Sequence, residues 1–574
     1  MVYADWCRRF DTLDPAARDS LSQRLSAGTD PQAISLLLPL PAAGDIESAD
    51  ARAAFWASLR AQTFSDWSLS IGHAPDSDPV SLAWWKDMAA SDARVRLLAV
   101  PQGGAAGRQA LLDAVRTPWV AFTDTSDRWR EHALPLLAEA AARWPQAVLV
   151  YADEDRLDPA GERVDPGFKC DWNPELLLGE DCIGRPAMWR AAQLRATGAL
   201  ETVSEAAWQH DLALRATERA ADDAVVHVPH VLLHRLKAPA VDARASALAV
   251  QAHFDRTGIA AQAQAWPGGE ARGGVEVRFA LPEPPPSVTI VIPTRNGLDI
   301  LRAAVESIQR LTSYPRFDIL IVDNGSDDPA CLAYLKRLSQ TPGVGVLRDE
   351  RPFNYSALNN AAVARASGDV VALLNNDIEV IAPGWLDEMV SLAAQPGVGA
   401  VGARLLYSDH TLQHGGVILG LNGYAGHAYR GAPAADLPPR MHRLQRFCAV
   451  TGACLVVRRS TYLQAGGLDE EAFTVGFNDI DFCLRLRAMG LRNLWTPRAD
   501  LYHHESRSRG SDFRDPARLQ RFERERQIFW QRWGAVARCD PAYNPNLTLE
   551  REDFSPADPP RVSLSRPWFE RLDA

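Results

Sequence analysis

Short hydrophobic runs alternate with longer amphipathic stretches along most of this chain. In the first half the runs are Ser35–Leu40, Trp67–Gly72, Trp119–Asp124 and Ala147–Asp155. In the second half, strands are expected at Thr289–Ile292, Ile319–Val322, Val370–Leu374 and Cys454–Val457. Strand-like runs that alternate with helix-like segments are typical of α/β domains with a mainly parallel sheet. The pattern therefore predicts α/β structure in both halves.

The length of the chain, 574 residues, exceeds what one hydrophobic core ordinarily serves. The Gly- and Pro-rich stretch that contains PEPPP reads as a linker between two domains. A helix with aromatic residues on one side is expected over 514–533. We predict a helical lead-in (1–33), an α/β domain (34–265), a linker (266–286), a second α/β domain (287–535) and an irregular C-terminal tail (536–574).

The two halves match each other in order, which indicates a duplication. LLLP ending at Pro39 matches IVIP ending at Pro293, and VLLH ending at His234 matches DLYH ending at His503. Between these ends, three residues of the first half stand where the second half has a carboxylate: His73 for Asp323, Ser126 for Asp377 and Gln209 for Asp479. The sequence thus predicts two copies of one fold.

Composition and charge narrow the class of protein. Hydrophobic residues make up 47% and charged residues 23%, as in soluble globular proteins, and the net charge of -11 argues against a nucleic-acid partner. No apolar run approaches a membrane span, and the N-terminus lacks a signal-peptide pattern. The eight cysteines are scattered without CxxC pairs, so we expect free thiols in a reducing cytosol and a cytoplasmic location.

Polar side chains follow several expected strands of the second half, where ligands bind in doubly wound sheets. Asp323 follows ILIV, Asn375–Asp377 follows VVALL, and His503 and His504 follow a short extended segment. Asp479 and Asp481 open a helical run. Each motif alone has an ordinary structural explanation, such as an Asx turn or acids in a first helical turn. Their order and spacing together indicate one functional site.

These motifs resemble the inverting GT-A glycosyltransferases of family 2, especially bacterial enzymes that build O-antigen and other surface polysaccharides, many of them rhamnosyltransferase-like. The motifs are SVTIVIPTRNG, FDILIVDNGSDD, GDVVALLNNDIEV, GFNDIDFCLRLR and LYHHESRSRG. YADEDRLD and the segment from Phe168 to Arg190 resemble the family's tandem-domain members. The resemblance implies two tandem, Rossmann-like GT-A domains.

The resemblance also implies a role for each matching residue. Asp479 would be the catalytic base, and Asp377 and His503 would bind a divalent cation, Mn²⁺ or Mg²⁺. The donor, a nucleoside-diphosphate sugar, would be held at Pro293, Thr294, Asp323, Asn375 and Asn376. Asp481, His504 and Arg507 are secondary candidates. NND keeps only the last Asp of the family's DXD motif, and Asn478 replaces a Glu that many relatives carry.

The first half has lost these groups. Gln209 cannot accept a proton near neutral pH, so it cannot replace a general base. We therefore expect a catalytically degenerate copy that supports the second domain or holds acceptor glycan. A relocated site that uses the surviving Asp211 and the acids at 153–155 stays open.

The predicted activity is the transfer of a hexose or deoxyhexose to a hydroxyl of a bacterial glycan or lipid-linked acceptor, with inversion. One alternative is a bifunctional synthase with two working sites, which needs Asp124 or Asp127 to bind metal. Another is a non-catalytic glycan-binding scaffold. Peripheral contact with the inner face of the cytoplasmic membrane is open, through the aromatic side of 514–533. The sequence does not identify the sugar, the acceptor or the linkage.

Overall fold

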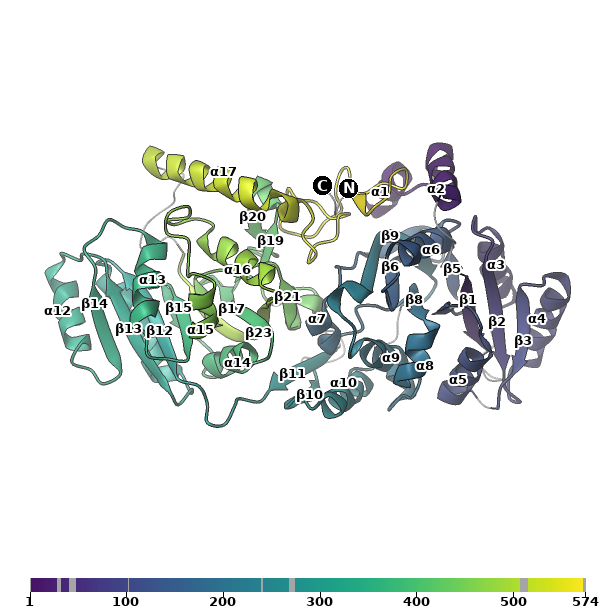
Figure 1. Cartoon of the computed structure of the whole chain (residues 1–574), viewed down its shortest axis with the longest axis horizontal. Helices are drawn as coiled ribbons and strands as arrows, with labels where there is room; N and C mark the ends of the chain where they lie inside the picture. The colour runs from purple at the N-terminus through teal and green to yellow at the C-terminus, as the bar shows by residue number, and fades with distance from the viewer. Residues whose placement is uncertain are drawn as a thin grey trace.

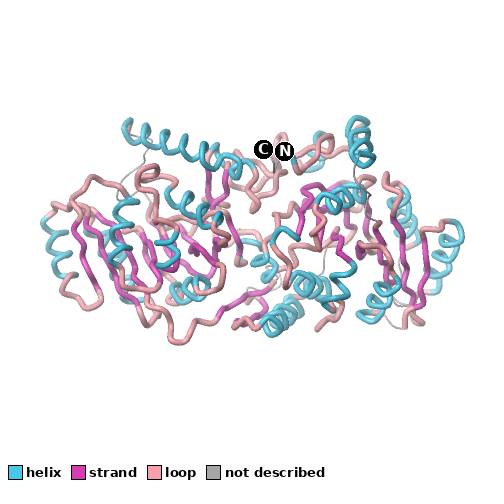
Figure 2. The backbone as a smooth tube through the Cα atoms, viewed as in Figure 1, coloured by secondary structure: helices cyan, strands magenta, loops and turns pink. Residues whose placement is uncertain are grey.

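The computed structural model contains two α/β domains that lie side by side along the long axis of the molecule (Figure 1). It describes residues 2–27, 33–40, 48–101, 103–238, 241–267, 274–505 and 515–570. In each domain a twisted sheet lies between helices, as the magenta strands and cyan helices of Figure 2 show. The central strands are buried on both faces, which explains why they read as unbroken hydrophobic runs.

The first domain is built on a nine-stranded sheet with the order β3-β2-β1-β4-β8-β6-β9-β5, to which β7 adds beside β6. The strands are β1 (Ile34–Pro39), β2 (Trp67–His73), β3 (Val95–Ala99), β4 (Trp119–Phe122), β5 (Asp127–Trp129), β6 (Leu149–Leu157), β7 (Arg163–Gly167), β8 (Ala187–Arg190) and β9 (Val225–Arg235). The helices up to this domain's end are α1 (Tyr3–Phe10), α2 (Pro15–Ala27), α3 (Ala49–Arg60), α4 (Pro79–Ser91), α5 (Gly104–Ala114), α6 (Ala133–Arg143), α7 (Pro174–Gly179), α8 (Ala191–Thr197), α9 (Trp208–Thr217) and α10 (Ala243–Thr257).

The second domain is built on a ten-stranded sheet with the order β14-β13-β12-β15-β22-β17-β23-β16, plus β18 beside β17 and β21 beside β23. Its strands are β12 (Val288–Thr294), β13 (Phe317–Asp323), β14 (Val344–Arg348), β15 (Val370–Leu374), β16 (Ile378–Val380), β17 (Val398–Leu406), β18 (Leu412–His414), β21 (Gln445–Phe447), β22 (Cys454–Arg458) and β23 (Arg492–His503). A small separate sheet pairs β19 (Val417–Leu419) with β20 (Ala425–His427). The helices are α11 (Leu298–Leu311), α12 (Pro329–Leu338), α13 (Tyr355–Arg365), α14 (Trp385–Ala393), α15 (Arg459–Gln464), α16 (Asn478–Ala488) and α17 (Pro516–Arg538).

The two main sheets repeat one topology, strand for strand. Both begin with parallel pairs around the first strand, β1 with β2 and β4, and β12 with β13 and β15. Both continue through an antiparallel strand, β8 or β22, to a pair of parallel strands, β6 with β9 or β17 with β23. Both end with a short antiparallel strand, β5 or β16. The predicted fold class, two tandem α/β domains of the GT-A type with mainly parallel sheets, is therefore confirmed.

Two matching helices, α9 and α16, show which residue of the first domain corresponds to the candidate base Asp479. In α9, Asp211 binds Arg215 one turn later at 3.0 Å, and in α16 Asp481 binds Arg485 in the same way at 2.8 Å. Because these ion pairs occupy the same place in matching helices, Gln209 lies where the second domain has Asp479.

The strand register corrects another of the predicted matches. His503 pairs with Ile378 at the start of β16, and Arg235 pairs with Asp127 at the start of β5. The counterpart of His503 is therefore Arg235 and not His234, which lies one residue earlier. Register shifts between β6 and β9 and between β17 and β23 are not visible in the hydrophobic pattern, so the sequence match ended on the wrong residue.

Part of the expected linker is ordered structure. Residues 268–273 lie outside the described part, but β11 (Val275–Phe279) forms an antiparallel ribbon with β10 (Ala261–Ala265). Glu276 on β11 pairs with Arg498, which also binds Glu388 of α14 at 3.0 Å. The ribbon thus ties the end of the first domain to the second.

The aromatic side of α17 packs on its own domain. Phe529 is fully buried against Phe477, and Phe522 also contacts Phe477. The indole N–H of Trp533 donates to Asp481 at 2.9 Å. The Phe529 ring is therefore buried against its own domain, whereas Phe522 and Trp533 are half-buried there. Among the described helices, none combines the length and apolarity needed to cross a bilayer.

The segment after α17 returns to the first domain and lies beside the N-terminal helix α1 (Figure 1). Asn544 donates to Asp153 at 2.8 Å, and the indole of Trp6 donates to the carbonyl of Ala557 at 2.8 Å. Val562, Leu564 and Trp568 belong to the same buried cluster as the first sheet. The C-terminal tail is thus irregular but packed.

Candidate active site

The ends of three neighbouring strands bring the predicted donor-binding residues together. Thr294 ends β12 and is paired with Asp323 at the end of β13, while Pro293, one residue earlier, is buried inside the strand. The side-chain amide of Asn376, which follows β15, donates to Thr294 Oγ1 at 3.1 Å. These residues form one wall at the carboxyl edge of the sheet, where α/β folds bind ligands.

Asp323 is buried at this edge and organises the loop that follows it. One carboxylate oxygen accepts the backbone N–H of Ser326 at 3.0 Å, and the other accepts from the guanidinium of Arg348. The hydrogen bond to Asp323 raises the pKa of Arg348, which stays charged. The structure therefore gives Asp323 a turn-forming role, and its contact with a nucleotide stays a prediction.

Asp377 and His503 face each other because their strands are neighbours. Ile378 pairs with His503 across β16 and β23, which places Asp377 Oδ1 3.3 Å from His503 Nε2. Both side chains are buried, at 5% and 8% exposure, yet Asp377 Oδ1 accepts no hydrogen bond from a described residue. A buried carboxylate oxygen without a donor, beside an imidazole nitrogen, suits a divalent cation as the third partner.

No group of three or more His, Cys, Asp or Glu side chains in the described residues could hold a metal ion. Asp377 and His503 are two ligands, so phosphate oxygens of a donor would have to complete the coordination. Mg²⁺ and Mn²⁺ bind in this way, through one or two protein ligands and substrate phosphates. The donor set therefore fits a metal that is held jointly by protein and substrate.

Asp479 lies in the first turn of α16. Its Oδ2 accepts the backbone N–H of Gly452 at 2.7 Å, and its Oδ1 accepts the N–H of Ile480 at 2.9 Å. Burial raises the pKa of the Asp479 carboxyl above its usual range, although these backbone donors oppose the shift. A half-buried carboxylate with raised proton affinity is chemically suited to act as a general base.

Tyr355, the first residue of α13, connects the two carboxylates. Its hydroxyl lies 3.1 Å from Asn375 Oδ1 and 3.0 Å from the carbonyl of Gly452, the residue that holds Asp479. Asn375 in turn lies 3.4 Å from His503 Nε2. A continuous chain of contacts therefore runs from Asp377 and His503 to Asp479, and the structure gathers these distant residues around one place. No sequence motif had singled out Tyr355.

Two histidines that sequence reasoning missed lie next to this centre. His414 accepts from the Thr451 N–H through Nε2 at 3.4 Å, so its Nδ1 carries the proton and donates to His427 Nδ1 at 2.7 Å. Burial lowers the pKa of both imidazoles, that of His427 to about 4, so both are neutral. The pair supports the loop of Thr451 and Gly452. The sequence shows these histidines as isolated residues, without a motif.

Two of the secondary candidates, Asp481 and His504, make contacts away from the centre. Asp481 is fully buried and binds Arg485, Arg532 and the indole of Trp533, so it anchors α17. His504 turns the other way from His503 and lies 3.1 Å from Glu379. Arg507 falls outside the described residues.

The corresponding place in the first domain is filled by protein. The guanidinium of Arg185 binds the buried Asp127 at 2.8 Å, and the same carboxylate oxygen accepts from Thr123. Burial raises the pKa of Asp127, although Arg185 opposes the shift. The cavity lined by Arg185 and Gln209 measures only about 10 Å³. That cavity is too small for a nucleotide sugar, because small-molecule sites typically measure about 300 Å³ or more.

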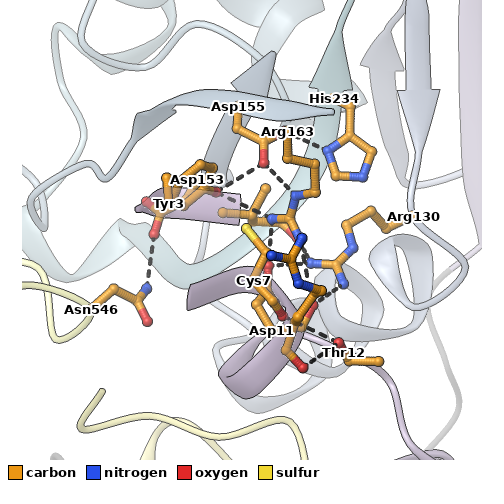
Figure 3. A network of polar contacts seen from close by, with 12 residues as sticks. Tyr3, Cys7, Asp11, Thr12, Arg130, Asp153, Asp155, Arg163, His234 and Asn546 are labelled. Atoms are coloured by element: carbon orange, nitrogen blue, oxygen red, sulfur yellow. Dashed lines mark hydrogen bonds and ion pairs between the residues drawn. The ribbon is translucent and has the colours of Figure 1, made fainter. Parts of the chain in front are cut away.

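The acidic cluster of the first domain is also engaged in structural contacts (Figure 3). Asp155 binds Arg163, Tyr3 and His234, and Asp153 binds His227 and Asn544. Glu154 pairs with Arg235 at 3.0 Å. Asp155 thus holds the N-terminal helix and Asp153 holds the C-terminal tail, which speaks against a relocated active site built on these acids.

The second domain therefore combines a doubly wound α/β sheet with a carboxylate–imidazole pair and a second carboxylate around one centre. Residues 289–444 match the model of glycosyl transferase family 2. The second domain is therefore a family 2 glycosyltransferase domain. Asp479 and His503 lie beyond the matched stretch, so the match does not test their roles.

Three curated relatives extend this result. An uncharacterized protein, y4gI, of Sinorhizobium fredii is 40% identical over 88% of this chain and 56% of its own length. The O-antigen biosynthesis protein RfbC of Myxococcus xanthus is 33% identical over 96% of this chain and 43% of its own. An N-acetylglucosaminyl-diphospho-decaprenol L-rhamnosyltransferase of Mycobacterium tuberculosis is 29% identical over 38% of this chain and 75% of its own. The chain spans about half the length of the first two relatives.

Proposed function

We propose that this chain transfers a sugar from a nucleoside-diphosphate donor to a hydroxyl of a bacterial glycan, at a single site in the second domain. The observation that carries the proposal is the contact chain that joins Asp377 and His503 to Asp479 through Asn375 and Tyr355. A transferase needs a place for the leaving diphosphate and a base for the attacking hydroxyl, and these residues supply both.

The reaction is a single displacement. The acceptor oxygen forms a bond to the anomeric carbon while the bond from that carbon to the diphosphate oxygen breaks. Asp479 takes the proton of the acceptor hydroxyl, and the configuration at the anomeric carbon inverts. General base assistance of this kind contributes about 10²–10⁴-fold to a rate.

Asp377 and His503 would hold a divalent cation, Mn²⁺ or Mg²⁺, together with the diphosphate. Such an ion acts as a Lewis acid and neutralises charge that develops on the leaving group. The protein's part is to orient the Asp377 carboxylate, and the backbone N–H of His504, which donates to the Asp377 carbonyl at 2.9 Å, helps to fix this residue.

The substrates are proposed at the level of class. Two relatives, an O-antigen biosynthesis protein and an N-acetylglucosaminyl-diphospho-decaprenol L-rhamnosyltransferase, favour a hexosyl or deoxyhexosyl donor and a glycan or lipid-linked acceptor. With a lipid-linked acceptor, the transfer reaction would take place at the inner face of the cytoplasmic membrane.

Calorimetric titration with UDP-, GDP- and dTDP-sugars in the presence of Mn²⁺ tests the proposal. We expect one donor class to bind at one site per chain and Asp377→Asn to weaken that binding. Ser126→Ala, at the matching place of the first domain, should leave it unchanged. Two sites per chain would favour a bifunctional synthase, and no binding by any donor would refute the proposal.

A further inference from the structure

A second cavity, distinct from the candidate active site, lies where the two domains and the C-terminal tail meet. Its volume is about 270 Å³. Small-molecule sites typically measure about 300–1,000 Å³, so this one suits a ligand the size of a single sugar residue. The first domain contributes Trp172 and Asp223, the second contributes Arg446 and Arg487, and the tail contributes Trp568.

Aromatic rings form part of the cavity wall. Trp144 and Trp568 stack, with ring centroids 5.2 Å apart and an angle of 21° between the ring planes. Trp172 is half-buried, and its indole N–H donates to no described residue. A pyranose has one face rich in C–H groups and a rim of hydroxyls. Flat aromatic surface covers the C–H face, and a free indole N–H can donate to a hydroxyl.

The charges in the cavity favour a neutral polar ligand over an anion. Arg446 is already neutralised by Glu175 at 3.1 Å and Asp222 at 2.6 Å. Asp223 adds an exposed carboxylate, which would repel a diphosphate. Arg487, whose guanidinium contacts the Cys448 thiol, forms no ion pair with a described carboxylate and can donate to hydroxyls. Fixed donors and acceptors of both kinds match a ring of hydroxyl groups.

The cavity is coupled to Asp479 through α16. Arg487 lies in the last turn of this helix and Asp479 in the first, which at 1.5 Å per residue places them about 12 Å apart along its axis. The loop after β21 makes a second connection, because Cys448 lines the cavity and Gly452 binds Asp479. The cavity is therefore too far away to hold the reacting sugar, but within reach of a glycan chain.

We propose that this interdomain cavity binds a sugar residue of the acceptor glycan, set back from the hydroxyl that reacts. The proposal rests on the proposed function, since it assigns the acceptor to that same site. It also gives the degenerate first domain a role in the reaction, because that domain supplies part of the acceptor-binding surface.

Saturation-transfer-difference NMR with a panel of monosaccharides tests the proposal without a known acceptor. The panel contains L-rhamnose, D-glucose, D-galactose, D-mannose and N-acetyl-D-glucosamine. We expect one sugar class to receive saturation from the wild-type protein. Trp172→Ala and Arg487→Met should each weaken that binding roughly tenfold, the effect of losing one stacking or charge-assisted contact. Trp172→Phe keeps a flat ring and should retain most of it.

Trp84→Ala, which removes a half-buried indole from α4 at the far side of the first domain, is the matched control and should bind like wild type. Donor hydrolysis is measured on every variant and should persist in all of them. Absence of binding by every sugar, or binding that survives both cavity substitutions, would overturn the cavity proposal. Loss of donor hydrolysis in the wild type, with sugar binding retained, would instead refute the proposed function and leave the cavity as a sugar site.

Discussion

Replacing Asp479 by Asn tests the proposed chemistry most directly. Asn has nearly the same shape, and its single oxygen can keep one of the two backbone hydrogen bonds, from Gly452 or from Ile480. The lost hydrogen bond should cost about 1 kcal/mol of folding stability. The amide cannot accept a proton, so the loss of general base assistance should slow transfer about 10²–10⁴-fold, or about 2.7–5.4 kcal/mol in the barrier.

The assay is the initial rate of sugar transfer from the donor that binds in calorimetry, with Tm as the control for folding. Gln209→Ala, at the same position of the matching helix in the first domain, is the paired variant and should leave the rate unchanged. The reasoning is refuted if folded Asp479→Asn retains more than about a tenth of the wild-type rate. It is equally refuted if Gln209→Ala abolishes transfer.

Three further outcomes are expected. Asp479 must be ionised to accept a proton, and burial raises its pKa. The value of kcat/KM should therefore rise with pH, with a midpoint above the pKa of about 3.9 that is usual for an Asp side chain. A midpoint at or below that pKa would contradict the assignment of Asp479 as the base. Asp377→Asn should weaken Mn²⁺ binding in the presence of nucleotide, as measured by electron paramagnetic resonance of Mn²⁺. Loss of a residue that merely hydrogen-bonds to a metal ligand already costs about 10–100-fold in affinity, so loss of a ligand should cost at least as much. Asp481→Asn should lower the free energy of unfolding by up to about 3–5 kcal/mol, because the buried carboxylate neutralises Arg485 and Arg532. Urea unfolding measures this change, and the folded variant should still bind the donor. Unaltered stability with lost activity would assign Asp481 to the acceptor site instead.

The hydrophobic pattern was sufficient to predict the duplicated α/β fold. Fully buried parallel strands such as β12 and β15 are continuous apolar runs, and the residue after each run marks the edge of the sheet. For that reason the pattern also placed Asp323 and Asp377 correctly at strand ends. The roles of these residues are a separate matter and stay predictions.

Contacts between distant segments could not be predicted from the pattern. Tyr355 opens an ordinary helix, and only the tertiary fold places its hydroxyl between Asn375 and Gly452. Arg185 fills the corresponding site of the first domain from the loop before β8, and the hydrophobic pattern does not indicate its contact with Asp127. The match of His234 to His503 was wrong by one residue because a single register shift changes which residue faces the site.

The return of the C-terminal tail to the first sheet sets an order for folding during synthesis. Domains usually fold as units as they leave the ribosome, the N-terminal one first. Here the first domain lacks Val562, Leu564 and Trp568 of its core until the whole second domain has also been made. The nascent first domain therefore keeps an uncovered apolar patch while the second domain is synthesised. Separating the halves at 266–286 would deprive the first domain of that cover permanently.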